Sequence, residues 1–242
     1  AFQEGWLGIY PLMDRTALIA SYSSELAKDE AISGTISAQA RLKIERDVVV
    51  SPVSPGARLK HWIGNCVAIG DAAVSLDPLD AVQLQALNLG LSYLISLFPV
   101  NRDNMMEADI YNMKLTSHAR ALRYFQISHF TLNRRSGEPF WDAARGQNVP
   151  ETLARKFRLF ESRGVVAMEE EDTFQEENWT SIFVGHQLMP KSWDPQVDQI
   201  PEQEQIANFQ RILSFIASEV QAMPSLQAHL ELNAPRSSDY IF

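Results

Sequence analysis

Residues 62–81 read WIGNCVAIGDAAVSLDPLDA, the most informative pattern in the chain. The run from Asn65 to Gly70 is short and apolar and is followed by Asp71, which favours a strand buried on both faces. After Ala81 the pattern becomes helical. We therefore expect a buried strand that delivers Gly70 and Asp71 to a tight junction between a strand and a helix.

This junction has the chemistry of a ligand site. Glycine at position 70 allows a ligand to approach the backbone closely, and the Asp71 carboxylate can accept hydrogen bonds from sugar hydroxyls. The small pair Ala72-Ala73 leaves room for a flat ring, and the helix that follows presents free N–H groups to an anion. Taken alone, the pattern is equally consistent with an aspartate that caps a helix after a buried strand.

Upstream of this stretch, short apolar runs alternate with turns. Residues 6–12 and 17–22 are strand-like, and residues 13–16 between them are typical of a hairpin turn. Residues 28–42 favour a helix with acidic residues in its first turn. The β-branched run at 47–51 favours another strand.

Downstream, the pattern is helical. Leu84, Leu87, Leu91, Leu94 and Phe98 recur at spacings of three and four and so lie on one helix face. Further helices are expected over 106–132, 152–160 and 203–223. The sequence thus predicts an α+β fold, in which a mixed or antiparallel sheet with the strand-to-helix motif is followed by a mostly helical C-terminal part. We expect a domain boundary between 1–100 and 101–242.

Composition excludes several classes of function. The 242 residues carry 21 Lys and Arg against 30 Asp and Glu, a net charge of −9. Such an acidic chain is a poor partner for nucleic acid or an anionic membrane. The one cysteine, Cys66, rules out an intramolecular disulfide and a cysteine-rich zinc site, and no other metal site is expected. Its place in the apolar run predicts an inert buried thiol.

The chain opens with Ala1, and no signal-peptide pattern follows. The opening residues read like the middle of a strand. We therefore expect a fragment that lacks an upstream half, from a cytoplasmic protein.

The central stretch resembles the second flavin-contacting motif of flavin-dependent monooxygenases, and most closely that of the flavin-dependent tryptophan halogenase family. The residues that carry this resemblance are Trp62, Asn65–Gly70, Ala72-Ala73 and Asp77–Ala81. Further segments resemble the family in the same order along the chain: 5–12, 129–130, 138–141, 179–190 and 223–225.

The resemblance implies roles for individual residues. Contacts to FAD are implied for Gly70, Asp71, Ala72 and Pro78. A halide ion would meet the backbone N–H groups of Val82 and Gln83. Asp80 takes the position of the family's catalytic glutamate, one methylene shorter. An aromatic, indole-like substrate would be bordered by Phe130, Glu138, Phe140 and Trp141.

The resemblance also implies a reaction. Reduced FAD, supplied by a separate flavin reductase, reacts with dioxygen, and halide attacks the resulting flavin hydroperoxide to give hypohalous acid. That acid travels to a lysine beside the aromatic substrate. These 242 residues contain neither the Gly-x-Gly-x-x-Gly phosphate loop nor the segment with that lysine. We therefore expect the chain alone to be inactive and to need an N-terminal half or an equivalent chain.

Two alternatives remain open. The departures at Gly8, Asp80 and Ala81 favour a flavin-dependent hydroxylase or oxidase without the halide step. A non-catalytic remnant that binds a partner chain through exposed apolar residues is the other.

Individual residues also have simpler interpretations. Asp80 would cap the next helix, and Phe140 and Trp141 would be ordinary core aromatics. His118 and His129 would be satisfied helix histidines, and the acidic run at 169–172 would be a solvated loop.

Overall fold

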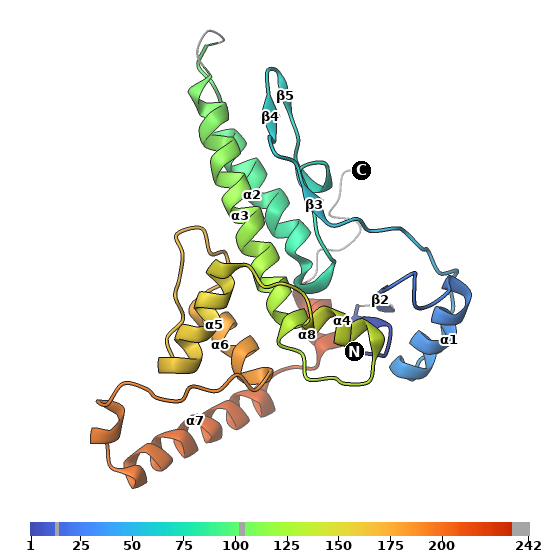
Figure 1. Cartoon of the computed structure of the whole chain (residues 1–242). Coiled ribbons are helices and arrows are strands. Elements are labelled where there is room, and N and C mark those ends of the chain that lie inside the picture. The colour runs from blue at the N-terminus through green and yellow to red at the C-terminus, as the bar shows by residue number, and fades with distance from the viewer. Residues whose placement is uncertain (13–14, 102–104, 234–242) are drawn as a thin grey trace. The chain divides into compact units, whose positions relative to one another are not determined.

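The computed structural model describes residues 1–12, 15–101 and 105–233 (Figure 1). The chain forms two compact units. The first comprises residues 1–8 and 19–192, and the second comprises residues 9–18 and 193–242. Position 100, where the sequence suggests a boundary, lies between two packed helices of the first unit.

Helices dominate both units. The first unit contains α1 (Asp29–Ala40), α2 (Val82–Ser96), α3 (Met106–Thr131), α4 (Pro139–Arg145), α5 (Glu151–Arg163) and α6 (Glu176–Gly185). The second contains α7 (Glu202–Ala222) and α8 (Leu226–Asn233). The helices expected over 28–42, 106–132, 152–160 and 203–223 are thereby confirmed to within a few residues. Within the described part of the chain, no helix has the length and apolar character needed to cross a membrane.

The described strands form three two-stranded sheets. β1 (Gly5–Pro11) pairs with β2 (Thr16–Tyr22), β3 (Gly56–Ala57) pairs with β6 (Val74–Ser75), and β4 (Trp62–Ile63) pairs with β5 (Cys66–Val67). The last two pairs are antiparallel. The two expected strands at 6–12 and 17–22 are confirmed, whereas residues 13 and 14 of the expected turn lie outside the described residues.

The strand expected over Asn65–Gly70 is wrong in length and burial. Only Cys66–Val67 is a strand, and it closes a short hairpin through Gly64, whose φ is +56°. Cys66 is exposed, so the expected buried thiol is also wrong. Val67 and Ala68 pack on the core around α2 and α3, which explains the apolar run without a strand buried on both faces. Residues 47–51 form no strand.

α2 and α3 lie side by side and form the centre of the first unit (Figure 1). The residues that α2 buries are Val82, Ala86 and Gly90, while Leu84 is 61% exposed. A Cβ at position 90 would lie 3.4 Å from the Tyr111 hydroxyl of α3. Two small residues of α2, Ala86 and Gly90, are thus buried, and Gly90 permits the close approach of α2 to α3.

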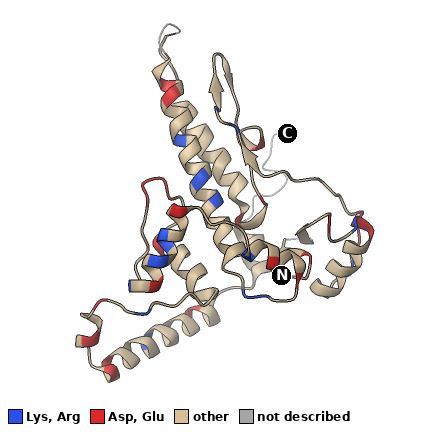
Figure 2. Cartoon of the chain, viewed as in Figure 1, with Lys and Arg blue, Asp and Glu red and all other residues tan. Residues whose placement is uncertain are grey.

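A second core joins the end of α3 to α5 and α6. Its buried residues are Phe125, Leu153, Phe160, Val166, Trp179, Ile182 and Phe183. The acidic run that precedes α6 is attached to this body rather than fully solvated (Figure 2). Lys156 pairs with Asp172 at 2.5 Å with both side chains almost fully buried, and Lys114 reaches Glu170 and Glu171.

The second unit is small. A short 3₁₀ turn, Val197–Gln199, precedes α7. The Gln205 amide donates hydrogen bonds to the carbonyls of Val197 and Ile200 and so fixes the entry into that helix.

Candidate functional site

A network of hydrogen bonds holds the loop that precedes α2. The Asp77 carboxylate accepts from the Trp6 indole at 3.0 Å, the Ser21 hydroxyl at 2.8 Å and the Leu79 backbone at 2.9 Å. The buried Gln126 amide of α3 donates to the carbonyls of Asp77 and Leu79. Segments far apart in the sequence thereby define the position of the loop.

The end of this loop has an unusual backbone. Asp80 and Ala81 both have positive φ values, 61° and 53°. Consecutive residues other than glycine in this region are uncommon, and each costs roughly 1–3 kcal/mol. No side chain caps α2. Asp80 is therefore not the helix cap that its position suggests, and its side chain makes a different contact.

The Asp80 carboxylate lies against His129 of α3. Asp80 Oδ2 is 3.2 Å from His129 Nε2, and each side chain is about one quarter exposed. Nε2 itself is closed to water and makes no hydrogen bond of regular geometry, so the contact between the two side chains rests on their separation of 3.2 Å. The sequence shows no acidic partner near His129, because the partner lies in a distant segment.

Aromatic rings surround His129. Phe125 meets it edge to face with ring centroids 5.7 Å apart, and His186 does so at the same distance. Burial, followed by the charge of His129, lowers the pKa of His186 from its ordinary value. His186 follows α6, and the sequence marks it only as part of the family-like segment at 179–190.

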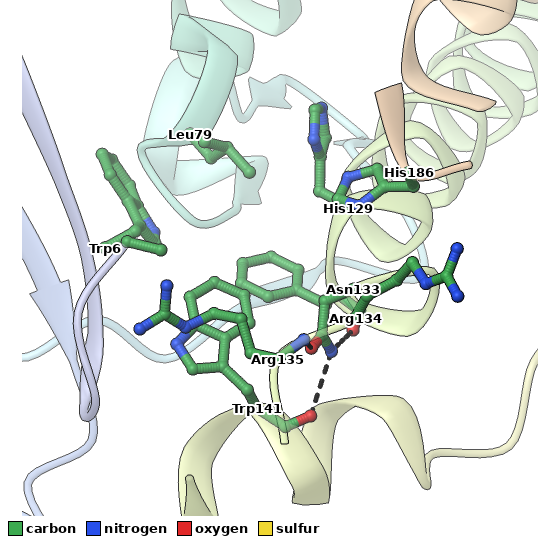
Figure 3. Close-up of a pocket in the computed structure, with 10 residues that line it drawn as sticks. Trp6, Leu79, His129, Asn133, Arg134, Arg135, Trp141 and His186 are labelled. Atoms are coloured by element: carbon green, nitrogen blue, oxygen red, sulfur yellow. Dashed lines mark hydrogen bonds between the residues drawn. The ribbon is translucent and has the colours of Figure 1, made fainter. Parts of the chain in front are cut away.

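A cavity of about 290 Å³ opens beside His129 and His186 (Figure 3). It is lined by Ala1, Trp6, Leu79, His129, Phe130, Asn133, Arg134, Arg135, Trp141 and His186. Phe130 and Trp141 stack within it, with ring centroids 6.0 Å apart and an angle of 21° between the rings. Of the four residues expected to border a substrate, these two line the cavity.

The other two lie behind the wall. Glu138 binds the Arg135 guanidinium through two hydrogen bonds, of 2.5 and 2.7 Å. Phe140 packs edge-on against Trp141 at 5.0 Å. Neither Glu138 nor Phe140 lines the cavity. Each contacts a residue that does line it. The sequence pattern marks this segment, but it does not show which side chains turn toward the cavity.

A second cavity of about 240 Å³ borders Asp80. It is lined by Asp80, Ala81, Leu84, Gln85, Asn88, Thr173 and Phe174. Asp80 thus belongs to the wall of this cavity, and His129 to the wall of the aromatic one. The ion pair connects the two walls.

The residues expected to contact a flavin lie on the surface. Gly70, Asp71 and Ala72 form a 3₁₀ turn, and Gly70 has a φ of +56°. Asp71 and Ala72 are exposed, and Pro78 is half-buried. None of the four lines either cavity. Gly70 follows the short β5 rather than the long buried strand that the sequence suggests.

The two residues expected at a halide differ from each other. Val82 has no exposed surface and belongs to the core between α2 and α3. Its N–H is closed to solvent in this structure. Gln83 is half-buried, and its side-chain amide donates to the Leu76 carbonyl at 2.7 Å.

The cavities have no arrangement of metal ligands. Among the described residues, no group of three or more His, Cys, Asp and Glu side chains could hold a metal ion. The side chains at the cavities include a carboxylate, two imidazoles, two guanidinium groups and a set of aromatic faces.

Comparison with known proteins places the chain in a family. The family model described as tryptophan halogenase matches residues 1–202. Tryptophan 7-halogenase KtzQ from Kutzneria sp. (strain 744) is 25% identical over 95% of this chain and 46% of its own length. BrvH, a flavin-dependent halogenase from Brevundimonas sp. BAL3, is 29% identical with a TM-score of 0.90, over 97% of this chain and 48% of that one.

A second solved structure shares the fold. Xcc4156, a flavin-dependent halogenase from Xanthomonas campestris, has a TM-score of 0.86 at 22% identity, over 97% of this chain and 48% of that one. The chain thus spans about half the length of the relatives it matches. Since the family model matches well over half of the residues, the chain belongs to the tryptophan halogenase family.

Proposed function

We propose that the protein containing this chain is an FAD-dependent, halogenase-like enzyme that acts on an aromatic, indole-like substrate. One observation supports this most directly. The Asp80–His129 pair joins a cavity with aromatic walls, which His129 lines, to a second cavity, which Asp80 lines. A flat apolar space with a few polar groups at one edge is the usual form of a small-molecule site.

The exposed turn at residues 70–72 fits a flavin. The Asp71 carboxylate is exposed and makes no hydrogen bond or ion pair with the described residues, so it is available to sugar hydroxyls. Ala72 beside it is small and exposed. In this proposal Gly70, Asp71, Ala72 and Pro78 hold FAD. When reduced by a separate flavin reductase, FAD supplies the electrons that activate dioxygen.

The aromatic cavity would hold the substrate. Phe130 and Trp141 offer ring faces against which an indole stacks. Trp141 is rigid, because its indole donates to the Phe2 carbonyl at 2.7 Å, and the Asn133 amide holds its backbone carbonyl. The Asp80 carboxylate stands where it can orient a polar oxidant that leaves the second cavity. An N-terminal half or an equivalent chain would supply the lysine and the phosphate loop.

A flavin-dependent hydroxylase or oxidase without a halide step is the second candidate. The complete burial of Val82 favours it, since one of the two expected halide contacts is closed. The side chain of Asp80, which is shorter than that of a glutamate, also favours this candidate.

The test uses the complete protein with reduced FAD, dioxygen, bromide and indole, analysed by mass spectrometry. Brominated indole supports the proposal. Hydroxylated indole or peroxide alone supports the second candidate, and the absence of flavin binding overturns both. The Asp80→Asn variant should lose product while it still binds FAD, whereas Asp47→Asn, an exposed aspartate outside the site, should match the wild type.

A further inference from the structure

His129 has no assigned role, although it makes the closest side-chain contact to Asp80. Asp80 requires such a contact. Its backbone and that of Ala81 are both left-handed, and neither conformation is favourable for a residue with a Cβ. Strain of this kind persists only where the surroundings over-determine it. The Asp77 network holds the start of the loop, and His129 meets the side chain at its end.

Ring contacts hold His129 itself in place. Its ring lies between Phe125 and His186, each an edge-to-face contact at 5.7 Å. Phe125 in turn stacks on Phe174 at 3.6 Å and belongs to the second core. The ring is thus anchored to a packed body, while Asp80 lies on a strained loop. The anchored ring therefore limits where the Asp80 carboxylate can lie, because a residue locked by packing positions the functional side chain that it contacts.

We propose that His129 is a positioning residue that holds the Asp80 carboxylate in the wall between the two cavities. The proposal rests on the proposed function of Asp80 and adds to it the group on which that function depends. It also accounts for the shorter acid at position 80. An aspartate side chain has fewer rotamers than a glutamate and reaches less far. A fixed imidazole beside it defines the position that a glutamate carboxylate would reach without such a contact.

The experiment compares His129→Leu, which removes both ring nitrogens, with His129→Gln, whose amide N–H can replace Nε2. Bromination of indole by the complete protein gives kcat and KM. We expect His129→Leu to lose about 100-fold in kcat, the effect of misplacing a group by about 1 Å. KM should change by less than about threefold, because the stacked rings of Phe130 and Trp141 are unchanged. His129→Gln should recover most of the lost kcat.

His118→Gln is the matched control. His118 is another buried histidine of α3, but its Nε2 lies 2.8 Å from the Tyr93 hydroxyl. It lines neither cavity, and kcat should stay near the wild-type value. A fall in kcat for this control as large as that for His129→Leu would overturn the proposal.

A crystal structure of His129→Leu separates this proposal from the proposed function. The Asp80 carboxylate should shift by about 1 Å or more, even if the wild type halogenates nothing and the proposed function fails. An unmoved carboxylate, or an unchanged kcat in His129→Leu, overturns the positioning role. Equal losses in His129→Leu and His129→Gln, with Asp80 in place in both, also overturn it.

Discussion

The Trp6 indole N–H donates a 3.0 Å hydrogen bond to the Asp77 carboxylate, which connects β1 to the loop that carries Asp80. The two residues are far apart in the sequence. Trp6 is buried and also lines the aromatic cavity. The same tryptophan therefore borders the aromatic cavity and holds the loop beside it.

Replacement of Asp77 by Ala should destabilise the first unit by about 2–4 kcal/mol, because hydrogen bonds to a charged group are stronger than neutral ones. Trp6, Ser21 and the Leu79 N–H all lose their acceptor. Chemical denaturation measures the loss. Asp77→Asn keeps one acceptor oxygen and should lose less, and equal losses in the two variants would contradict the explanation.

The buried pair of Lys156 and Asp172 predicts an asymmetric result. Lys156→Met leaves a buried carboxylate unpaired and should cost about 3–5 kcal/mol of unfolding free energy. The double variant with Asp172→Leu should recover much of that loss, since no charge is then buried alone. Lys114→Met, at an exposed pair, is the control with a smaller effect. A double variant less stable than Lys156→Met would contradict this view.

Stability should decrease as the pH falls through the histidine range. Burial lowers the pKa of His61, His118 and His186 from the ordinary value of 6.5. The unfolded chain therefore binds these protons first, and their contribution to stability is complete above about pH 6.5 and declines below it. Thermal unfolding between about pH 7 and 5 measures the slope. His118→Gln and His61→Gln should each flatten it, and unchanged slopes would count against burial as the cause.

Phe130 and Phe140 should differ in their effect on ligand binding. Phe130→Ala removes a ring from the cavity wall and should weaken indole binding about 10-fold. Phe140→Ala removes a ring behind the wall and should have a smaller effect on the dissociation constant. Isothermal titration of the complete protein gives both values. A larger effect for Phe140 would place the substrate elsewhere.

Asp71 should affect FAD binding without affecting stability. Its carboxylate is exposed and makes no bond with the described residues, so Asp71→Ala should leave Tm unchanged. FAD should bind about 10-fold more weakly if sugar hydroxyls donate to this carboxylate. Flavin fluorescence measures the dissociation constant, with Asp47→Ala as control. Equal affinity in the two variants would remove Asp71 from the flavin site.

Much of the helical part could be predicted. α3, α5 and α7 match their predicted ranges to within a few residues, since helical periodicity and the prolines and glycine at the ends are local signals. The apolar run after Trp62 led to the wrong prediction of a buried strand, because an apolar run indicates that residues are buried but not which element they pack against. It packs beside two helices within a short hairpin.

The candidate site could likewise be predicted only in part from the sequence. Family motifs marked the segments around Asp80, Phe130 and Trp141, and the structure brings all three to the cavities. Local pattern did not reveal that Val82 is sealed in the core or that Glu138 is bound to Arg135. Burial and ion pairing depend on neighbours that come from other parts of the chain.

The order of amino acids alone is enough for the ranges of the longer helices and for the family motifs, because each depends on residues close together in the sequence. The contact between Asp80 and His129 arises only when α3 packs beside the loop before α2. The left-handed backbone at Ala81 likewise has no signal in its residue type. Tertiary packing decides both, since it supplies the ring that meets the carboxylate and the hydrogen bonds that hold the loop in a conformation the isolated segment would not keep.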